Sequence, residues 1–547
     1  MWWLLICEVV VACLLTLAAS RYFIHMLQLE SYQLDGYMRW LKKDKANMFG
    51  WTFQTGVGAS VAFYVLPVVI SMFITGERQK SSVISSVIVM AVTVAYSAYM
   101  IYKDFGRTQK KPLVFTKRVK RLYAVLVGVT VVISALVALI FGRNDTVNAK
   151  RAVLYLSPYL LLAACPFVVM LAGRLAQPIE DNINHSFFLK AQAKLNSLDK
   201  MKKIGITGSY GKTSTKYCLA AILSEKYKVF YPKASINTPM GLSKVVNEEL
   251  TDDMDVFIAE MGARHVGDIK ELVELVHPEF GMITSVGPQH LETFKTVETV
   301  ANTKYELIEG LPKTGKAFFA ADGGEVDKLY NRCKIQKFRA GLSDGYLDMR
   351  AEDIEVGAFG SRFTLIESDG SSVKVETKLL GRHNISNIVL CCQVARQVGM
   401  SLTEIAEGVK RIKPVKHRLQ LITGAMNVID DAFNSNPVGA KEALNVLHSF
   451  PGRHLVITPG FVEMGENEDK FNYELGAHIA KTCDAAILVG PRHTSPIRQG
   501  MLDMGFDEKK ILVVNTLDEA AKNIPVFASN GDAVLFENDL PDNYTEK

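Results

Sequence analysis

The sequence predicts an α/β protein, with a P-loop central domain and a Rossmann-like C-terminal domain, preceded by an all-α domain of five transmembrane helices. The chain has 547 residues, which is too long for one compact domain. Of these residues 48% are hydrophobic, and the excess lies in the first 176 residues. After that point short apolar strands alternate with helical stretches, which is typical of parallel sheets. We expect domains over 1–180, 181–415 and 416–547.

Five apolar runs in the first domain are each about the 20 residues that a bilayer-spanning helix needs. The runs cover residues 1–19, 53–75, 81–102, 122–141 and 152–171. A cleaved signal peptide would show a single run, so the first run is predicted to be a retained anchor. Lys and Arg gather in the loops after the first and third runs, and basic loops stay in the cytosol. This pattern predicts an outside N-terminus and a cytosolic location for everything after the fifth run.

A glycine-rich loop opens the central domain. The stretch GSYGKTS, residues 208–214, follows a short apolar strand and leads into a helix, which is the context of a phosphate-binding loop. Lys212 is expected to reach the β and γ phosphates of ATP, and the Thr213 hydroxyl to bind Mg²⁺. The usual motif has another glycine where this chain has Ile206. The predicted ATP-binding residues of the loop are Gly208, Ser209, Tyr210, Gly211, Lys212, Thr213 and Ser214.

The net charge and the cysteine spacing give no support to three kinds of protein. The net charge of +5 is small for this length and gives no indication of nucleic-acid binding. The eight cysteines form no C-x-x-C pair, so neither a zinc ribbon nor a disulfide framework is predicted.

Further motifs follow the loop in a fixed order. Glu260 ends the strand of VFIAEMGAR, and His290 precedes a helix that carries Lys304. The stretch GRHNISN holds His383, Asn384 and Asn387, KHRLQ holds Arg418, and DDAFNSNP holds Asp431, Asn434 and Asn436. In this order and spacing, the motifs over about residues 200–540 resemble the Mur ligase superfamily of ATP-dependent, amide-forming enzymes of cell-wall peptide synthesis. DDAFNSNP and AEMGAR are most similar to its D-alanyl-D-alanine-adding branch, MurF.

The resemblance implies roles for these residues. Thr213 and Glu260 would hold one Mg²⁺, and His290 with a carbamylated Lys304 a second. The catalytic set would be Lys212, Glu260, His290 and Lys304. ATP would also meet His383, Asn384 and Asn387 near the base, and Arg418 and Asp431 near phosphate and ribose. Asn434 and Asn436 either face the incoming amine substrate or only build the turn before the next helix.

The implied function is a ligase at the bacterial cell membrane that works through an acyl phosphate. Its partners would be a small-molecule or lipid-linked muropeptide acceptor, an amino-acid or dipeptide amine, and membrane lipids. The same chemistry on another polymer, such as polyglutamate, and a catalytically silent membrane scaffold or sensor are alternatives. Two departures from the family pattern leave the identity of the substrates undecided. Membrane helices stand in place of the UDP-binding domain, and Glu537-Asn538-Asp539 stands where the MurF branch has a lysine followed by Gly-Ser-Arg.

Overall fold

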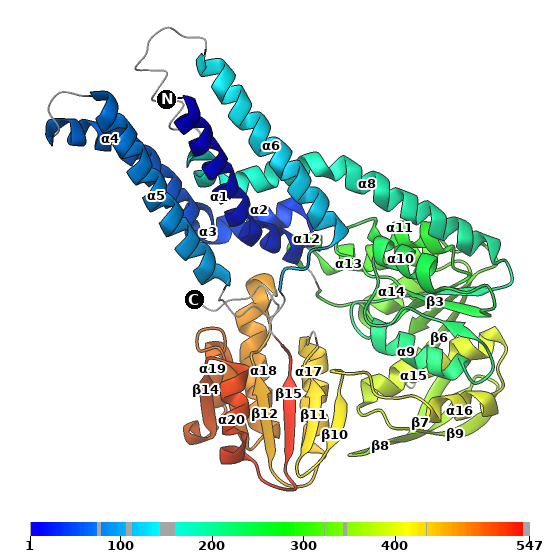
Figure 1. Ribbon diagram of the computed structural model, residues 1–547. Coiled ribbons are helices and arrows are strands. Elements are labelled where there is room, and N and C mark those ends of the chain that lie inside the picture. The colour runs from blue at the N-terminus through cyan, green and yellow to red at the C-terminus, as the bar shows by residue number, and fades with distance from the viewer. Residues whose placement is uncertain are drawn as a thin grey trace. The chain divides into compact units, whose positions relative to one another are not determined.

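The computed structural model of the chain describes residues 2–73, 78–105, 112–142, 159–289, 291–321, 323–342, 347–433, 435–462 and 464–539. The chain divides into two compact units, and the second begins at His185. Figure 1 labels the helices and strands of both units.

The first unit contains helices and no strand among its described residues. Its helices are α1 (Trp2–Leu29), α2 (Leu34–Lys43), α3 (Lys45–Phe49), α4 (Trp51–Phe73), α5 (Arg78–Phe105), α6 (Lys117–Gly142) and the first part of α8 (Cys165–Ser197). Among the described residues, three stretches are long and apolar enough to cross a membrane: Val9–Leu29, Trp51–Phe73 and Val83–Asp104. These correspond to the first three of the five expected runs.

The other two expected runs are not among these three candidate spans. Run 122–141 lies inside α6, which is a continuous helix. Run 152–171 overlaps residues 143–158, which lie outside the described residues. The helical character of the N-terminal region is confirmed, and the count of five spanning helices stays a prediction.

A short amphipathic helix, α2, packs beside the apolar helices. Its buried face carries Tyr37 and Leu41, and the Tyr37 hydroxyl donates a hydrogen bond to the carbonyl of Pro166 at 3.1 Å. The opposite face exposes Arg39, Lys42 and Lys43. A helix with one apolar and one basic face is typical of a membrane surface.

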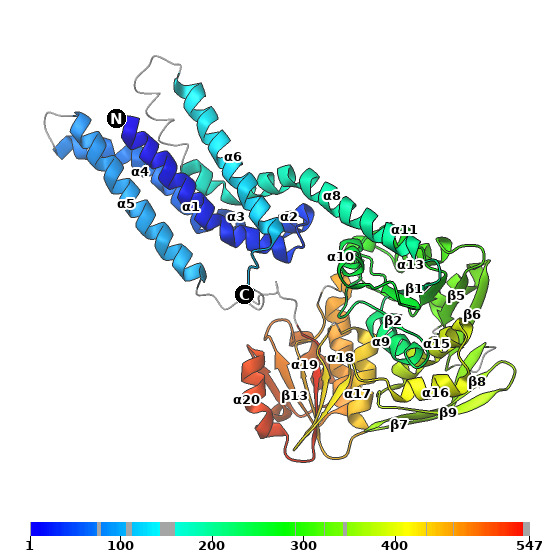
Figure 2. The ribbon, with the colours of Figure 1, turned by 45° about the vertical axis from the view of Figure 1, so that its right-hand side comes forward.

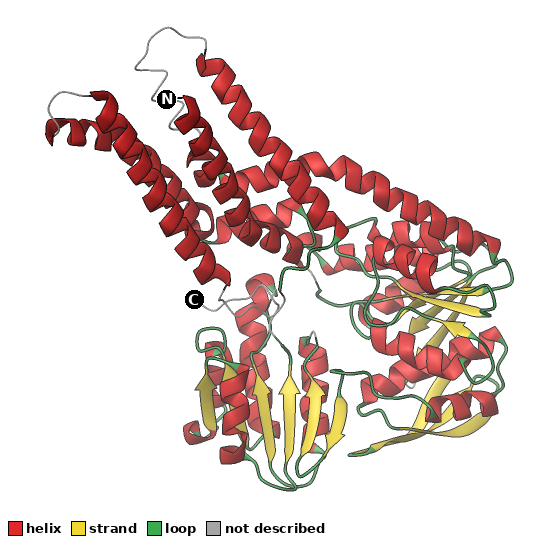
Figure 3. Ribbon diagram, in the orientation of Figure 1, coloured by secondary structure: helices red, strands yellow, loops and turns green. Residues whose placement is uncertain are grey.

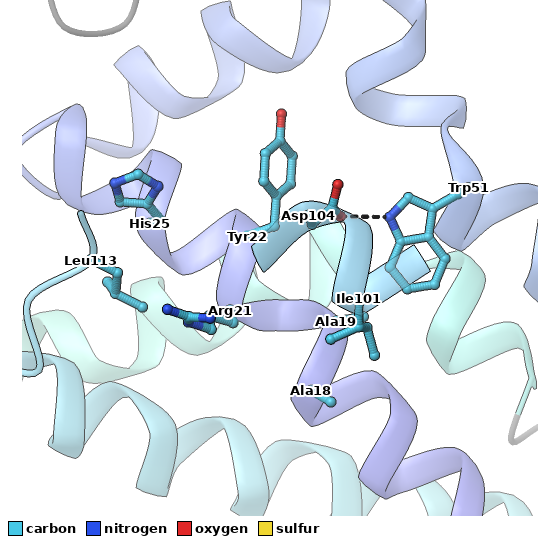
Figure 4. Close-up of a pocket in the computed structure, with 9 residues that line it drawn as sticks. All are labelled: Ala18, Ala19, Arg21, Tyr22, His25, Trp51, Ile101, Asp104 and Leu113. Atoms are coloured by element: carbon cyan, nitrogen blue, oxygen red, sulfur yellow. Dashed lines mark hydrogen bonds between the residues drawn. The ribbon is translucent and has the colours of Figure 1, made fainter. Parts of the chain in front are cut away.

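A small polar cavity of about 60 Å³ lies among α1, α4, α5 and the segment before α6 (Figure 4). Arg21 and His25 come from α1, and Trp51 donates its indole N–H to Asp104 Oδ2 at 3.0 Å. These residues stand near the start or end of the three candidate spans, at the end where the basic loops connect them. The positive-inside pattern predicts that this end faces the cytosol.

A nine-stranded sheet forms the centre of the second unit, in the order β2-β3-β1-β4-β5-β6-β7-β8-β9. Its strands are β1 (Lys202–Thr207), β2 (Val229–Phe230), β3 (Val256–Glu260), β4 (Phe280–Ile283), β5 (Lys316–Ala320), β6 (Gln336–Gly341), β7 (Met349–Gly357), β8 (Gly360–Glu367) and β9 (Ser372–Thr377). Strands β1 to β6 are parallel, and β7, β8 and β9 pair antiparallel. Alternating residues and an Asp-Gly turn over 353–381 predict a β-hairpin region, and these antiparallel pairs confirm it.

Helices cover both faces of this sheet (Figure 2). One apolar core joins the sheet to α9, α15 and α16, and the other joins it to the end of α8 and to α10, α11, α13 and α14. The helices are α9 (Lys212–Leu223), α10 (Pro239–Glu249), α11 (Asp268–Val276), α12 (Leu291–Phe294), α13 (Val297–Glu309), α14 (Gly324–Arg332), α15 (Arg382–Val398) and α16 (Leu402–Lys410). Because both faces are covered, the central strands read as continuous apolar runs.

A six-stranded sheet follows, in the order β10-β11-β15-β12-β13-β14, with helices on both sides (Figure 3). Its elements are β10 (Gln420–Thr423), β11 (Asn427–Asp431), α17 (Pro437–His448), β12 (His454–Thr458), η1 (Gly465–Asn467), α18 (Glu468–Thr482), β13 (Ala485–Val489), α19 (Ser495–Asp503), η2 (Glu508–Lys510), β14 (Ile511–Val514), α20 (Leu517–Phe527) and β15 (Ala533–Glu537). Among the described strands of this sheet, the edge strand β10 pairs antiparallel and the other five pair parallel. The expected α/β class, with mostly parallel sheets, is confirmed.

Candidate active site

The glycine loop lies at the carboxyl end of β1, between β3 and β4. Strand order reverses at this point, and in parallel sheets such a point is where ligands bind. Gly211 has a φ of 80°, which favours glycine, and a Cβ on Gly208 would come within 2.0 Å of Thr284 Oγ1. The turn into α9 therefore depends on both glycines.

Two loop residues are anchored to the segment after β4. The Ser209 N–H donates to Ser285 O at 2.8 Å, and the Tyr210 N–H donates to Ser285 Oγ at 2.9 Å. The Tyr210 hydroxyl donates to Pro288 O at 2.8 Å. Gly211, the residue before α9, offers no side-chain cap, so the first N–H groups of this helix can meet an anion.

Lys212 folds back over the loop. Its ammonium donates to Gly208 O at 2.6 Å and to Ser209 O at 3.1 Å. Burial lowers the pKa of Lys212 to about 8, while the charge of Glu260 works in the opposite direction. The ammonium thus stands over the concave side of the loop, where a phosphate would replace the carbonyl contacts.

The Glu260 carboxylate, at the end of β3, is the best-connected group of the site. It is 1% exposed, and its Oε1 accepts hydrogen bonds from Thr213 Oγ1 and from Asn237 Nδ2, each at 3.0 Å. The Lys216 ammonium, which is also buried, lies 3.1 Å from Oε2. Ser235 Oγ lies 3.3 Å from Thr213 Oγ1. The predicted pair of Thr213 and Glu260 is therefore in direct contact.

This pair fits a magnesium ion. Mg²⁺ binds oxygen ligands at about 2.1 Å in octahedral geometry, so two adjacent ligands lie about 3 Å apart. The 3.0 Å between Thr213 Oγ1 and Glu260 Oε1 matches that spacing. Within the part of the chain that the structure describes, no group of three or more His, Cys, Asp or Glu side chains gathers as a metal site, so protein ligands beyond this pair are not found there.

Lys304, on α13, is buried with 2% of its surface exposed. Burial lowers its pKa well below the usual value, and the charge of Lys212 acts in the same direction. No described carboxylate lies within ion-pair distance of the Lys304 ammonium. His290, the other residue predicted beside it, lies outside the described residues.

The start of α15 meets the loop. A Cβ on Gly211 would lie 3.2 Å from the Asn387 amide, so Asn387 touches the loop directly. Asn384 is buried and donates through Nδ2 to Leu380 O at 2.9 Å. His383 Nδ1 is buried without a hydrogen-bond partner among the described residues, and burial lowers the pKa of this imidazole to about 4.

The six-stranded domain contributes Arg418 and Asp431. Burial lowers the pKa of Arg418, while Glu260 and Asp431 lie close enough to favour its charged form. The guanidinium stacks 4.5 Å above the centre of the Phe433 ring. Asp431 Oδ1 accepts a hydrogen bond from the Leu419 N–H at 2.8 Å. The structure thus brings Arg418 and Asp431 together, and places Arg418 within electrostatic reach of Glu260.

Asn436 builds the start of α17. Its Oδ1 accepts hydrogen bonds from the N–H groups of Val438 at 3.2 Å and Gly439 at 3.0 Å, which makes it the N-cap of the helix. Asn436 was expected either to face the amine substrate or to build the turn before the helix, and this geometry shows the turn-building contacts. Asn434 lies outside the described residues.

Motif reasoning missed three residues of the site, and it noted Glu537 beside the site only as a departure from the MurF pattern. Lys216 and Asn237 contact Glu260, and Ser235 contacts Thr213. Glu537, fully buried, accepts a hydrogen bond from the Ser435 hydroxyl and interacts with Asp431. A lysine among the apolar residues of α9 was the one sequence signal that could have indicated a buried ion pair.

Comparison with known proteins places these features in a family. The family model described as the Mur ligase middle domain matches residues 206–395, and the one described as the Mur ligase, glutamate ligase domain matches residues 417–537. UDP-N-acetylmuramoyl-tripeptide–D-alanyl-D-alanine ligase of Escherichia coli (strain K12) is 32% identical over 316 residues, which cover 57% of this chain and 69% of the relative.

Two solved structures show the same fold. MurF from Acinetobacter baumannii has a TM-score of 0.59 and 25% identity, covering 65% of this chain and 77% of that chain. MurF ligase from Thermotoga maritima, in complex with ADP, has a TM-score of 0.59 and 24% identity, covering 66% and 81%. With the loop, Glu260 and both α/β sheets in place, the chain belongs to the Mur ligase family of ATP-dependent, amide-forming ligases.

Proposed function

We propose that the chain is a membrane-anchored ligase of the MurF type, which joins D-alanyl-D-alanine to the peptide carboxylate of a muramoyl-tripeptide. The observation that carries this proposal is the contact of Thr213 with Glu260. This contact lies beside Lys212, at the place in the nine-stranded sheet where the strand order reverses. The E. coli relative is named for this pair of substrates, which supports their assignment here.

We assign ATP to the loop and the helix that follows it. Lys212 and the first N–H groups of α9 would bind the phosphates, because an ammonium and a helix N-terminus both favour anions. Asn387 touches the loop, which supports a nucleotide contact from α15. The full set assigned to ATP is Gly208, Ser209, Tyr210, Gly211, Lys212, Thr213, Ser214, His383, Asn384, Asn387, Arg418 and Asp431.

We assign Thr213 and Glu260 to a Mg²⁺ ion, which when bound neutralises the charge on the phosphates. A second site would use His290 and a carbamylated Lys304. The depressed pKa of the buried Lys304 supports this modification, since a neutral amine is the form that attacks CO₂. That attack forms an N–C bond while one C=O π bond of CO₂ opens onto its oxygen, and the nitrogen then releases a proton, so a neutral amine becomes an anionic carbamate.

The reaction would proceed in two displacements. A carboxylate oxygen of the acceptor attacks the γ-phosphorus of ATP, and ADP leaves an acyl phosphate behind. The amine nitrogen then attacks the acyl carbon, loses its proton, and phosphate departs. Lys212 and Arg418, with the Lys216 charge behind Glu260, would place positive charge around the transferred phosphoryl group. Most of the catalysis in such transfers comes from positioning and charge neutralisation.

We propose the division into a transmembrane domain over 1–180, a central ATP-binding domain over 181–415 and a C-terminal domain over 416–547. The three candidate spans and the basic loops support a multi-pass anchor with cytosolic catalytic domains. An anchored enzyme would meet a lipid-linked form of the acceptor at the inner membrane surface, which makes that form the natural alternative to the UDP-linked one.

The test is phosphate release from ATP by the full chain in detergent. UDP-muramoyl-tripeptide or its lipid-linked form is supplied, with and without D-alanyl-D-alanine, and Lys212→Ala is assayed beside the unchanged protein. We expect release that requires acceptor and dipeptide together and falls at least about 10²-fold in the variant. Absence of release with both acceptors would overturn the MurF assignment.

A further inference from the structure

The two oxygens of the Glu260 carboxylate have different surroundings. Oε1 faces Thr213 Oγ1 and Asn237 Nδ2, each at 3.0 Å. Oε2 lies 3.1 Å from the Lys216 ammonium, and no described group donates a well-aligned hydrogen bond to it. One oxygen is therefore on the side of the proposed metal ligand Thr213, and the other is compensated by a buried positive charge.

Lys216 is itself held in place. It follows Lys212 by one turn of α9, and none of its side chain is exposed. Its ammonium also donates a hydrogen bond to the carbonyl of Ala234, a residue with a φ of 55°. A left-handed backbone at a non-glycine residue is uncommon, and here it directs a carbonyl at the ammonium. Both contacts restrict Lys216 to the Oε2 side of the carboxylate.

We propose that Lys216 is a positioning residue of the metal site: it holds Oε2 of Glu260, so that the carboxylate offers only Oε1 to a divalent cation. The inference rests on the assignment of Thr213 and Glu260 as metal ligands made above. Lys216 does not touch the nucleotide or the metal in this account. It acts through the carboxylate, by fixing its orientation and its number of available oxygens.

A carboxylate limited to one oxygen discriminates between cations. Mg²⁺ takes six ligands in a strict octahedron, whereas Ca²⁺ takes six to eight and often binds both oxygens of one carboxylate. Removing Lys216 leaves Oε2 without its counter-charge and releases the carboxylate to offer both oxygens. Ca²⁺ gains from that change, and Mg²⁺ does not.

The experiment measures cation selectivity rather than turnover. Thermal unfolding of the full chain in detergent with ADP is followed at increasing Mg²⁺ or Ca²⁺, and the shifts in Tm yield an apparent Kd for each cation. The four tryptophans all lie before residue 52, so labelling of buried thiols such as Cys218, Cys391 and Cys392 is used to report on the ligase domain. Lys216→Met is compared with the unchanged chain.

We expect Lys216→Met to lower Tm without metal and to raise the affinity for Ca²⁺ relative to Mg²⁺ about tenfold. Lys216→Gln keeps an N–H donor but no charge, so it should shift the ratio in the same direction by less, and it carries the test if the methionine variant does not fold. Lys226→Met is the matched control, because Lys226 forms an exposed ion pair with Glu404 at 3.2 Å. It should change neither quantity.

The outcomes separate two failures. A Mg²⁺:Ca²⁺ ratio that stays unchanged in every Lys216 variant that folds overturns the role of Lys216. An unchanged chain without any Mg²⁺-dependent shift, or a Glu260→Gln variant that keeps the full shift, overturns the metal-site assignment itself.

Discussion

Two buried glutamates, Glu260 in the nine-stranded domain and Glu537 in the six-stranded domain, end central strands at similar depth but meet opposite partners. Glu260 faces the Lys216 ammonium and two hydrogen-bond donors. Glu537 faces a second acid, Asp431, and the Ser435 hydroxyl. Burial, reinforced by Asp431, raises the pKa of Glu537 well above its usual range.

The difference shows how neighbours decide the charge of a buried acid. The Lys216 ammonium, 3.1 Å from Oε2 of Glu260, places a counter-charge directly beside that buried carboxylate. Two adjacent buried carboxylates repel each other, which makes it unfavourable for both to ionise. Asp431 and Glu537 therefore share a proton. Burial raises the pKa of Asp431 to about 6. The first acid is paired with a cation, whereas the second pair consists of two acids with raised pKa values, so the second site depends on pH.

The largest effect is expected from breaking the first site. Glu260→Gln leaves the Lys216 ammonium buried without its counter-charge and removes a proposed metal ligand. We expect a loss of at least about 10²-fold in kcat, from the weakened charge stabilisation, and about 3–5 kcal/mol of unfolding free energy. Phosphate-release kinetics and chemical denaturation measure the two losses. Near-normal values of both would show that Glu260 is not the centre of the site.

A smaller effect of opposite sign is expected at the second site. Glu537→Gln can donate to Asp431 and accept from Ser435, so it removes the conflict between two acids. Because the raised pKa of each acid lies above its unfolded value, the native protein keeps protons that the unfolded chain has released. Its unfolding free energy therefore falls as pH rises from about 4 through 6. The variant should lose the part of that dependence that Glu537 contributes, while the buried Asp431 keeps its own part, and it should be more stable at pH 7 by about 1–2 kcal/mol.

Denaturation at pH 5, 6, 7 and 8 measures this difference. A variant that is less stable than the unchanged chain by the same amount at every pH would show that the two acids do not share a proton.

The smallest effect tests the turn beside the second site. Asn436→Ala removes the cap of α17 and should lower the unfolding free energy by about 1 kcal/mol. Since both capped N–H groups lie within α17, the apparent KM for the dipeptide should stay unchanged. A several-fold rise in that KM with unchanged stability would give Asn436 a substrate role instead.

How much of the fold and the site can be predicted from the sequence depends on how far apart the interacting residues lie along the chain. The loop at Gly208–Lys212 and the antiparallel hairpin follow from local patterns, and so does a helix that starts at Pro437 after an asparagine. The pairing of Lys216 with Glu260 depends on α9 packing against β3, 44 residues later in the chain. The pairing of Asp431 with Glu537 depends on the register between β11 and β15.

The same distinction applies to the membrane domain. Apolar length predicted Trp51–Phe73 and Val83–Asp104 to within a few residues, because a spanning helix is recognised from local composition. The polar cavity with Arg21 and Asp104 needs three helices to converge, which no single run encodes. The resemblance to the family supplied the roles of Arg418 and Asp431, while their contacts came from the fold.

The most direct test follows the oxygen atoms of the acceptor. If the chain forms an acyl phosphate, a carboxylate oxygen of the muramoyl-tripeptide must leave with the phosphate. The acceptor is labelled with ¹⁸O in that carboxylate, and phosphate released in the presence of ATP and D-alanyl-D-alanine is analysed by mass spectrometry. The account predicts one ¹⁸O atom in each phosphate and no labelled phosphate with Lys212→Ala. Released phosphate that contains no ¹⁸O from the acceptor, because water supplied its fourth oxygen, would contradict the account.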